Sequence, residues 1–242
     1  MSPQSCLGIL LPEDGPTDYE WYTLNASAEA DELPTIEVGQ IPSDGLHAPG
    51  ALLALGATER LTPVGERLVN RHGVDAVVWA CTSASFIGGL DWARAQSVQL
   101  ESVLGVPVIS TALAFHEALA ALGCREVDLL SPYPDEVTRQ LMRFLEEGGV
   151  TVEHVEALDC TYAADSHQAD IVGAVSDFAR QYPETTRPLL VPDTAVNTLL
   201  RLDTLNECAG RQVLTANQVT LWAGLKRMNW PTIPERFCRA LR

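Results

Sequence analysis

Short apolar runs recur along the 242-residue chain, separated by longer stretches in which apolar positions have helical spacing. The runs are rich in Val, Ile and Leu and too short for helices, which predicts strands buried on both faces, as in a parallel sheet. A first strand is expected at 6–11, ended by Pro12 and a turn at 13–16. Later strands are expected at 74–80, 106–109, 127–130, 150–155, 189–191 and 213–214.

The stretches between these strands predict helices, among them 113–122, 171–179 and a final one at 219–225. Thr62 and Pro63 predict a helix start, as N-cap and first-turn proline, with the helix running to residue 73. Pro134 is expected to open another helix, closed by a Gly pair at 148–149. Segment 17–50 is rich in Pro and Gly and is expected to be irregular, with one strand near 35–38.

Two parts of the chain share a similar sequence pattern. Segment 74–83 is an apolar run that ends in Cys81 and hydroxyl residues, and segment 187–194 ends in Asp193 and Thr194. Each is followed by a helix-like stretch, a Gly and a second short run, at 105–111 and 210–217. The pattern predicts an α/β fold whose parallel strands end at a common edge. Two facing halves would place Cys81 and Asp193 on opposite walls of one cleft.

The composition excludes several classes of function. The net charge of −16, with Lys226 as the single lysine, argues against a nucleic-acid partner, because phosphate binding needs clustered basic residues. The first twelve residues lack a basic region and a long apolar run, so we expect a cytoplasmic protein with no membrane contact. Six cysteines without a Cys-x-x-Cys pair predict free thiols. The five histidines lack metal-ligand spacing, so no metal site is expected, and without the dinucleotide and P-loop glycine motifs nothing supports a site of either kind.

Cys81 is the strongest candidate for chemistry. It ends a central predicted strand, and residues 82–85 turn into the next helix, whose amide groups would favour a thiolate and bind a carboxylate. The alternative is a small buried hydrophobe, which is the usual role of a free cysteine. The other five cysteines lack this setting and are interpreted as structural.

Asp193 and Tyr133 also follow predicted strands. Asp193 could transfer a proton, or it could only cap a helix by accepting from the amides of Ala195 and Val196. The Tyr133 hydroxyl could donate to a substrate, or the ring could simply fill the core.

With these residues in hand, the chain resembles the Asp/Glu racemase superfamily, in the branch that holds maleate cis–trans isomerase and arylmalonate decarboxylase. The resemblance implies two pseudo-symmetric Rossmann-like lobes with the active site between them, no cofactor, and a homodimer. We assign 1–112 with 216–242 to the N-terminal lobe and 113–215 to the C-terminal lobe. The matching segments are 8–12, 80–86, 132–137 and 214–222.

The resemblance also implies roles for individual residues. Racemases and maleate isomerases of this superfamily have cysteine at both facing strand ends, whereas arylmalonate decarboxylases keep only the second. This chain keeps the first, Cys81, and has Asp193 at the second. These two are the expected catalytic residues. The expected substrate-binding residues are Pro12, Thr82, Ser83, Tyr133, Thr194 and Asn217.

Several reactions fit this pattern. Maleate-type isomerisation of a small carboxylate leads, because a Cys81 thiolate can add to a double bond. Racemisation, with Cys81 and Asp193 on opposite faces of the substrate, is a second route. Decarboxylation fits less well without the second cysteine. An ectoine-utilisation enzyme is a further alternative, because those proteins also resemble arylmalonate decarboxylase. A last alternative is a metabolite-binding protein, in which Asp193 marks the loss of catalysis.

An activated Cys81 should react with iodoacetamide near neutral pH much faster than the other five thiols, because the thiolate is the nucleophile. Peptide mapping after short exposure to the reagent measures the six rates. Equal rates would favour a purely structural Cys81.

Overall fold

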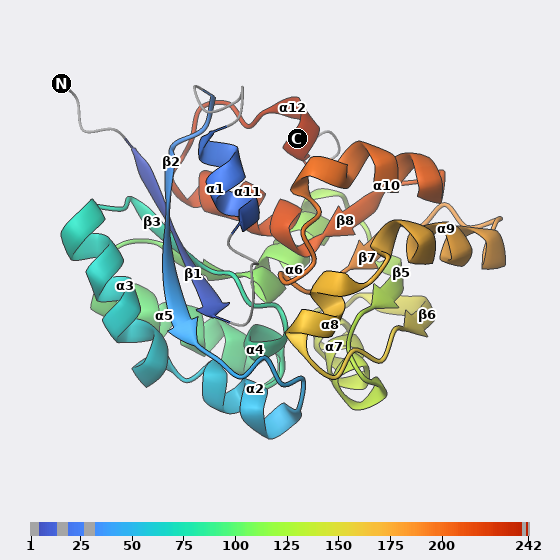
Figure 1. Ribbon diagram of the computed structural model, residues 1–242, viewed down its shortest axis with the longest axis horizontal. Helices are drawn as coiled ribbons and strands as arrows, with labels where there is room; N and C mark the ends of the chain where they lie inside the picture. The colour runs from blue at the N-terminus through green and yellow to red at the C-terminus, as the bar shows by residue number, and fades with distance from the viewer. Residues whose placement is uncertain (1–4, 14–18, 27–31, 239–240, 242) are drawn as a thin grey trace.

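The computed structural model describes residues 5–13, 19–26, 32–238 and 241, with the side chain of Cys238 excepted. The turn predicted at 13–16 falls largely outside the described residues. In the described part, eight parallel strands form two four-stranded sheets, β2-β1-β3-β4 and β6-β5-β7-β8. The second order repeats the first, since β5 to β8 occupy the places of β1 to β4. This arrangement confirms the predicted α/β class and the two similar halves (Figure 1).

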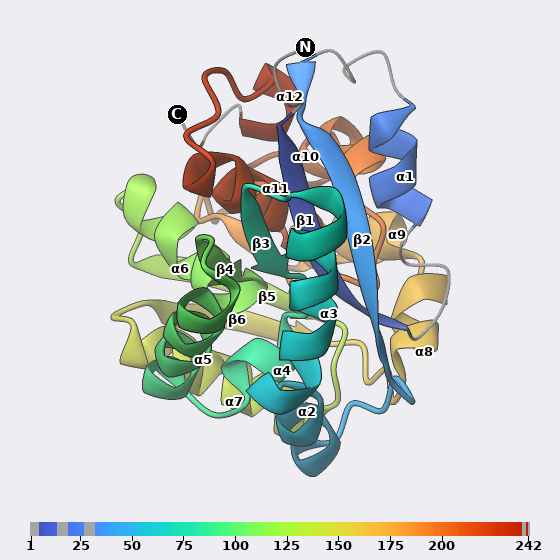
Figure 2. The same cartoon turned by 90° about the vertical axis from the view of Figure 1, so that its left-hand side faces the viewer.

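The first sheet is built from β1 (Cys6–Glu13), β2 (Thr35–Pro42), β3 (Ala76–Trp79) and β4 (Val108–Ser110). One face is covered by α3 (Thr58–His72) and α5 (Leu90–Leu104), which lie in front of the strands in Figure 2. The other face is covered by α1 (Tyr19–Asn25) and α11 (Ala216–Arg227). Close packing of α11 needs a glycine, because a Cβ at Gly224 would lie 2.8 Å from the Val78 side chain.

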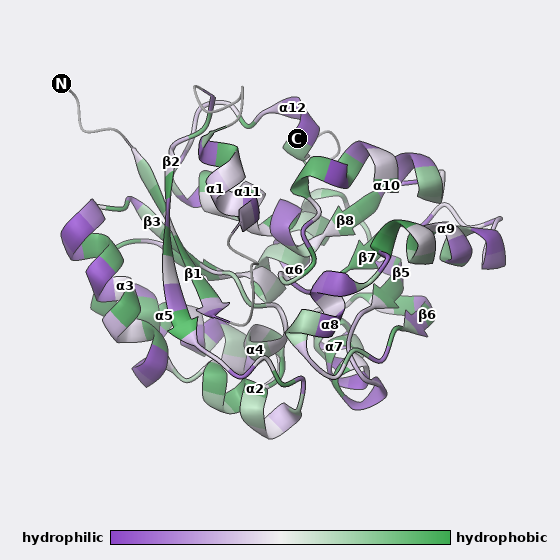
Figure 3. Cartoon of the chain, in the orientation of Figure 1, coloured by the Kyte–Doolittle hydropathy of each residue, from purple (hydrophilic) through white to green (hydrophobic). Residues whose placement is uncertain are grey.

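The second sheet is built from β5 (Glu126–Ser131), β6 (Thr151–Ala157), β7 (Leu189–Val191) and β8 (Val213–Thr215). Successive residues of β5 face opposite ways. Leu129 packs into the larger core together with α7 (Asp135–Glu147), whereas Leu130 packs with α9 (Ile171–Gln181) and α10 (Leu202–Ala209). In Figure 3 much of β1 and β3 is green, whereas the edge strand β6 and the outer turns of α3 and α9 carry purple.

The remaining elements are short or connect the sheets. They are α2 (Pro49–Leu55), α4 (Ser83–Phe86), α6 (Thr111–Ala121), α8 (Ala163–Gln168), a 3₁₀ turn η3 (Leu199–Arg201) and α12 (Glu235–Cys238). α6 packs against α11 and β4 and so lies on the first sheet, although it falls within the segment assigned to the C-terminal lobe. The lobe boundaries stay a prediction. None of the helices in the described ranges is both long and apolar enough to span a bilayer.

Four local predictions are wrong. Pro12 does not end the first strand, because β1 continues to Glu13 and stays paired with β2. The helix expected to start at Thr62 and Pro63 begins at Thr58, because burial of Leu61 extends its apolar face by a turn and Pro63 is accommodated inside it. The strand expected near 35–38 is present as part of β2, but the described residues of segment 17–50 are more regular than expected, since they also form α1 and the start of α2. β2 pairs with the whole of β1, a long-range contact that the local sequence does not reveal. The helix at 219–225 is not the last, because α12 follows it.

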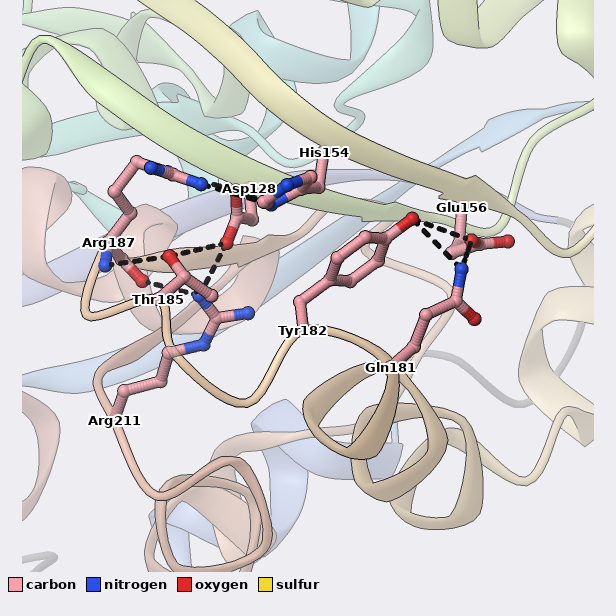
Figure 4. Close-up of polar contacts among 8 residues, drawn as sticks. All are labelled: Asp128, His154, Glu156, Gln181, Tyr182, Thr185, Arg187 and Arg211. Carbon is pink, nitrogen blue, oxygen red and sulfur yellow. Dashed lines mark hydrogen bonds and ion pairs between the residues drawn. The ribbon is translucent and has the colours of Figure 1, made fainter.

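A buried charge cluster closes the amino-terminal end of the second sheet (Figure 4). Asp128 of β5 is fully buried and accepts from Arg187 Nε at 3.1 Å, from Thr185 Oγ1 at 3.1 Å and from Arg211 Nη1. A register shift between β5 and β6 brings His154 opposite it, with Nδ1 3.1 Å from Oδ1. Burial would raise the pKa of Asp128, but the hydrogen bonds and charges of the arginines hold it below its ordinary value.

A second buried carboxylate fixes α1. Glu20 is 2% exposed; its Oε1 accepts from the Leu199 amide at 2.6 Å and its Oε2 from Asn217 Nδ2 at 2.7 Å. Burial raises the pKa of Glu20 to about 7, against the opposing effect of these donors. Glu20 therefore ties α1 to the segment after β7 and to the start of α11.

Replacing Asp128 by Asn should lower the free energy of unfolding by about 3–5 kcal/mol, because two guanidinium groups lose their buried counter-ion. The lowered pKa means that this stabilisation is present above the unfolded pKa and is lost as the pH falls through the folded value. Urea unfolding at pH 7 measures the loss. The control Asp91→Asn, at a fully exposed carboxylate, should change stability by less than about 0.5 kcal/mol. Equal effects of the two substitutions would contradict the assignment.

Glu20 predicts a pH dependence of the opposite sign. Its pKa is raised from 4.5 to about 7, so its contribution is present below pH 4.5 and is lost as the pH rises through 7. Compared with Glu20→Gln, the wild type should lose up to about 3 kcal/mol of unfolding free energy between pH 5 and pH 8. Urea unfolding of both proteins, with the exposed Glu66→Gln as control, measures the change. Parallel pH curves for wild type and Glu20→Gln would be inconsistent with a protonated Glu20.

Candidate active site

The carboxyl ends of β3 and β7 meet where the two halves touch. Cys81 lies two residues after β3 and Asp193 two residues after β7, and each is 5% exposed. Both line one pocket, as the repeat predicted for the two strand ends. The pocket is narrow and partly open to solvent, so only a small group could reach both side chains.

Two hydrogen bonds join the strand ends reciprocally. The Asp193 amide donates to Thr82 Oγ1 at 3.3 Å, and Thr194 Oγ1 donates to the Ala80 carbonyl at 2.9 Å. Each half thus supplies one hydroxyl and one backbone group to the other. Both threonines, predicted to bind substrate, therefore hold the two strand ends in register, although Thr194 also lines the pocket.

The pocket walls come from both halves and from the loop after β2. Of the predicted site residues, Pro12, Cys81, Ser83, Asp193 and Thr194 line it. The other lining residues are Ser43, Asp44, Gly45, Leu46, His47, Ala51, Leu52, Leu55, Ala163 and Ala195. None of these described residues is a lysine or arginine, so hydroxyl and N–H groups are left to bind an anionic group.

The setting of Cys81 differs from that of the other described thiols. Its Sγ lies 3.8 Å from Ser83 Oγ, and Ser85 Oγ donates to its carbonyl at 2.7 Å, which fixes the turn into α4. In contrast, burial and then the charges of nearby carboxylates raise the pKa of the Cys6 thiol to about 11, and burial also raises the pKa of Cys160. Neither of those thiols lines the pocket.

Asp193 divides its two oxygens between two neighbours. Its backbone is in the left-handed region, with φ of 81°, which Asp tolerates better than most residues. Oδ1 accepts from the Ala195 amide at 3.0 Å; because a turn and no helix follows at 194–196, this contact stabilises a turn and is not the helix cap weighed from the sequence. Oδ2 is buried without a hydrogen-bond partner among the described residues and lies 3.7 Å from His47 Nε2. One oxygen is therefore left for a second task.

His47 is the site residue that sequence reasoning missed. It lies in the loop after β2, where no spacing relative to Cys81 or Asp193 marks it, and only the fold brings it to the pocket. Its Nδ1 lies 2.9 Å from the Cys160 carbonyl, and its ring meets the edge of the Tyr133 ring at 4.9 Å between centroids.

Tyr133 packs against the His47 ring and lies close to Asp193 and Cys81. It is fully buried, and its hydroxyl makes no hydrogen bond of good geometry with a described residue. Burial, then the charges of Asp193 and Cys81, raise the pKa of Tyr133 well above its ordinary value, while nearby Thr82 and Ser83 act against this. The hydroxyl therefore stays protonated and remains a hydrogen-bond donor.

Asn217 lies behind the pocket, not on its wall. Its Nδ2 donates to Glu20 and lies 3.2 Å and 3.3 Å from the carbonyls of Thr194 and Val196. This residue, predicted to bind substrate, supports the loop that carries Asp193. Within the described ranges, no three His, Cys, Asp or Glu side chains are grouped so that they could hold a metal ion.

Known proteins share this fold and this sequence pattern. The chain is 26% identical over 208 residues to arylmalonate decarboxylase of Bordetella bronchiseptica, covering 78% of this chain and 85% of the relative. It is 25% identical over 170 residues to maleate isomerase of Pseudomonas putida, covering 66% and 67%.

Solved structures agree in fold. Maleate isomerase Iso of Pseudomonas putida S16 matches with a TM-score of 0.83 at 19% identity, covering 96% of both chains. A cysteine-to-serine mutant of Nocardia farcinica maleate cis–trans isomerase, with a covalently bound succinylcysteine intermediate, matches with a TM-score of 0.78 at 19% identity, covering 94% of both chains. The family model for arylmalonate decarboxylase matches residues 57–240. The chain therefore belongs to the arylmalonate decarboxylase family, in the branch that also holds maleate isomerase.

Proposed function

We propose that this protein is a cofactor-independent isomerase that converts a small cis-unsaturated dicarboxylate, of the maleate type, into its trans form. The observation that supports this most directly is the pocket in which Cys81, a potential nucleophile, lies together with Asp193. A cytoplasmic location and a homodimer stay predictions.

The proposed reaction begins with addition. The Cys81 thiolate forms a carbon–sulfur bond to one alkene carbon, and the π electrons move to the neighbouring carbon and its carboxylate. Rotation about the resulting single bond, followed by loss of the thiolate, re-forms the double bond in the trans geometry. No electron donor or acceptor is consumed. The succinylcysteine in the Nocardia farcinica relative is an adduct of this chemical type.

The pocket residues suit this chemistry. Ser83 lines the pocket, and its hydroxyl can donate to a substrate carboxylate, whereas the Thr194 hydroxyl donates to the Ala80 carbonyl. Tyr133 adds a protonated hydroxyl close to Asp193 and Cys81. Decarboxylation is supported less well, because the position that the resemblance gives to the decarboxylase cysteine is Asp193.

Incubation with maleate tests the proposal. Proton NMR should show fumarate, and intact mass spectrometry should show an adduct of one maleate on the wild type. Cys81→Ala should lose both signals, because the sulfur nucleophile is gone. Cys124→Ala, which removes a half-buried thiol outside the pocket, should keep both.

Parallel samples identify the competing reactions. Unchanged maleate together with racemised aspartate would replace isomerisation by racemisation, and carbon dioxide released from an arylmalonate would replace it by decarboxylation. No reaction with any of the three substrates would overturn the proposed enzyme activity on these substrate classes.

A further inference from the structure

The ring of His47 is held in one orientation by its surroundings. Nδ1 lies 2.9 Å from the Cys160 carbonyl, and a carbonyl oxygen only accepts, so Nδ1 carries a hydrogen. The His47 amide donates to the Thr161 carbonyl at 2.9 Å, which fixes the backbone of the same residue. With Tyr133 against the ring, Nε2 is directed at Asp193.

The contact between Nε2 and Asp193 needs a proton. Nε2 lies 3.7 Å from Oδ2, and the two side chains are only 4% and 7% exposed. A neutral imidazole with its hydrogen on Nδ1 would present a lone pair to a carboxylate oxygen that has no other hydrogen-bond partner among the described residues. At 3.7 Å the two atoms are too far apart for a hydrogen bond, but a hydrogen on Nε2 would replace two facing buried lone pairs by an ion pair.

The rest of the pocket reinforces this arrangement. The described lining residues include no lysine or arginine, so a dicarboxylate would otherwise meet the negative charge of Asp193 uncompensated. A protonated His47 neutralises that charge and leaves the pair able to give up a proton. The other titratable groups around the pair are Cys81, Tyr133, Cys160 and Asp44.

We propose that His47, with hydrogens on both ring nitrogens, forms an ion pair with Asp193, and that the two act together as the acid–base group that works opposite Cys81. The role builds on the proposed isomerisation. After Cys81 adds to one alkene carbon, the proton moves from Nε2 to the neighbouring carbon, and neutral His47 remains beside the Asp193 carboxylate. After rotation, Nε2 takes a proton back from that carbon, the double bond re-forms and the thiolate leaves.

The ion pair between His47 and Asp193 can be tested without any substrate. Proton–nitrogen NMR of histidine-labelled protein at pH 7, with His47→Gln to assign the signals, should show hydrogens on both ring nitrogens of His47. Asp193→Asn keeps an oxygen for the Ala195 amide but removes the charge, and should leave Nε2 unprotonated. An Nε2 that is unprotonated in the wild type, or unaffected by Asp193→Asn, would overturn the pairing. This result is independent of whether maleate is the substrate.

The catalytic role is tested by separating adduct formation from turnover. His47→Gln, whose amide can still donate to the Cys160 carbonyl, and Asp193→Asn should form the Cys81 adduct but make fumarate about 10²- to 10⁴-fold more slowly. The matched control His72→Gln, at a surface histidine beside Glu37, should behave as the wild type. Turnover of His47→Gln at the wild-type rate would overturn the role of His47. If the wild type makes no fumarate but the NMR result holds, the isomerisation fails while the paired proton stands.

Discussion

The site depends on the reciprocal pair of hydrogen bonds that joins the ends of β3 and β7. Because Thr82 accepts from the Asp193 amide and Thr194 donates to the Ala80 carbonyl, neither strand end can shift without breaking a buried bond. The two sheets repeat one strand order, so the bonded ends occupy equivalent places in each half. The repeated strand order therefore places the ends of β3 and β7 opposite each other, and the threonine hydrogen bonds fix the distance between them.

Further polar contacts stabilise the loop that carries Asp193. The loop at Asp193 has a backbone conformation that few residues adopt, and it continues into segment 194–199. Asn217 spans the carbonyls of Thr194 and Val196, and Glu20 accepts from both Asn217 and the Leu199 amide. A carboxylate on α1 thus stabilises a loop in the other half of the fold through one asparagine.

The replacement of a thiol by a carboxylate at position 193 changes what the pocket requires. A carboxylate carries its charge at neutral pH unless its surroundings prevent it, and an anionic substrate would be repelled. His47 lies where it can supply the compensating proton, and Tyr133 holds its ring from below. Family membership therefore does not fix the local chemistry of this pocket, because the fold is shared while Asp193 stands at the strand end to which the resemblance gives a cysteine.

The sequence by itself determined the alternation of strands and helices, the repeated unit, and the position of Cys81 and Asp193 at strand ends. Each of these features depends on the local pattern of apolar residues and on the residues that directly follow an apolar run. The tertiary structure alone decided that β2 pairs with β1, that Asn217 acts behind the pocket and that His47 enters it. These features arise from contacts between segments distant in the chain. Burial of Leu61 likewise overrode the helix-start signal at Thr62 and Pro63, because packing against the sheet outweighs a local preference.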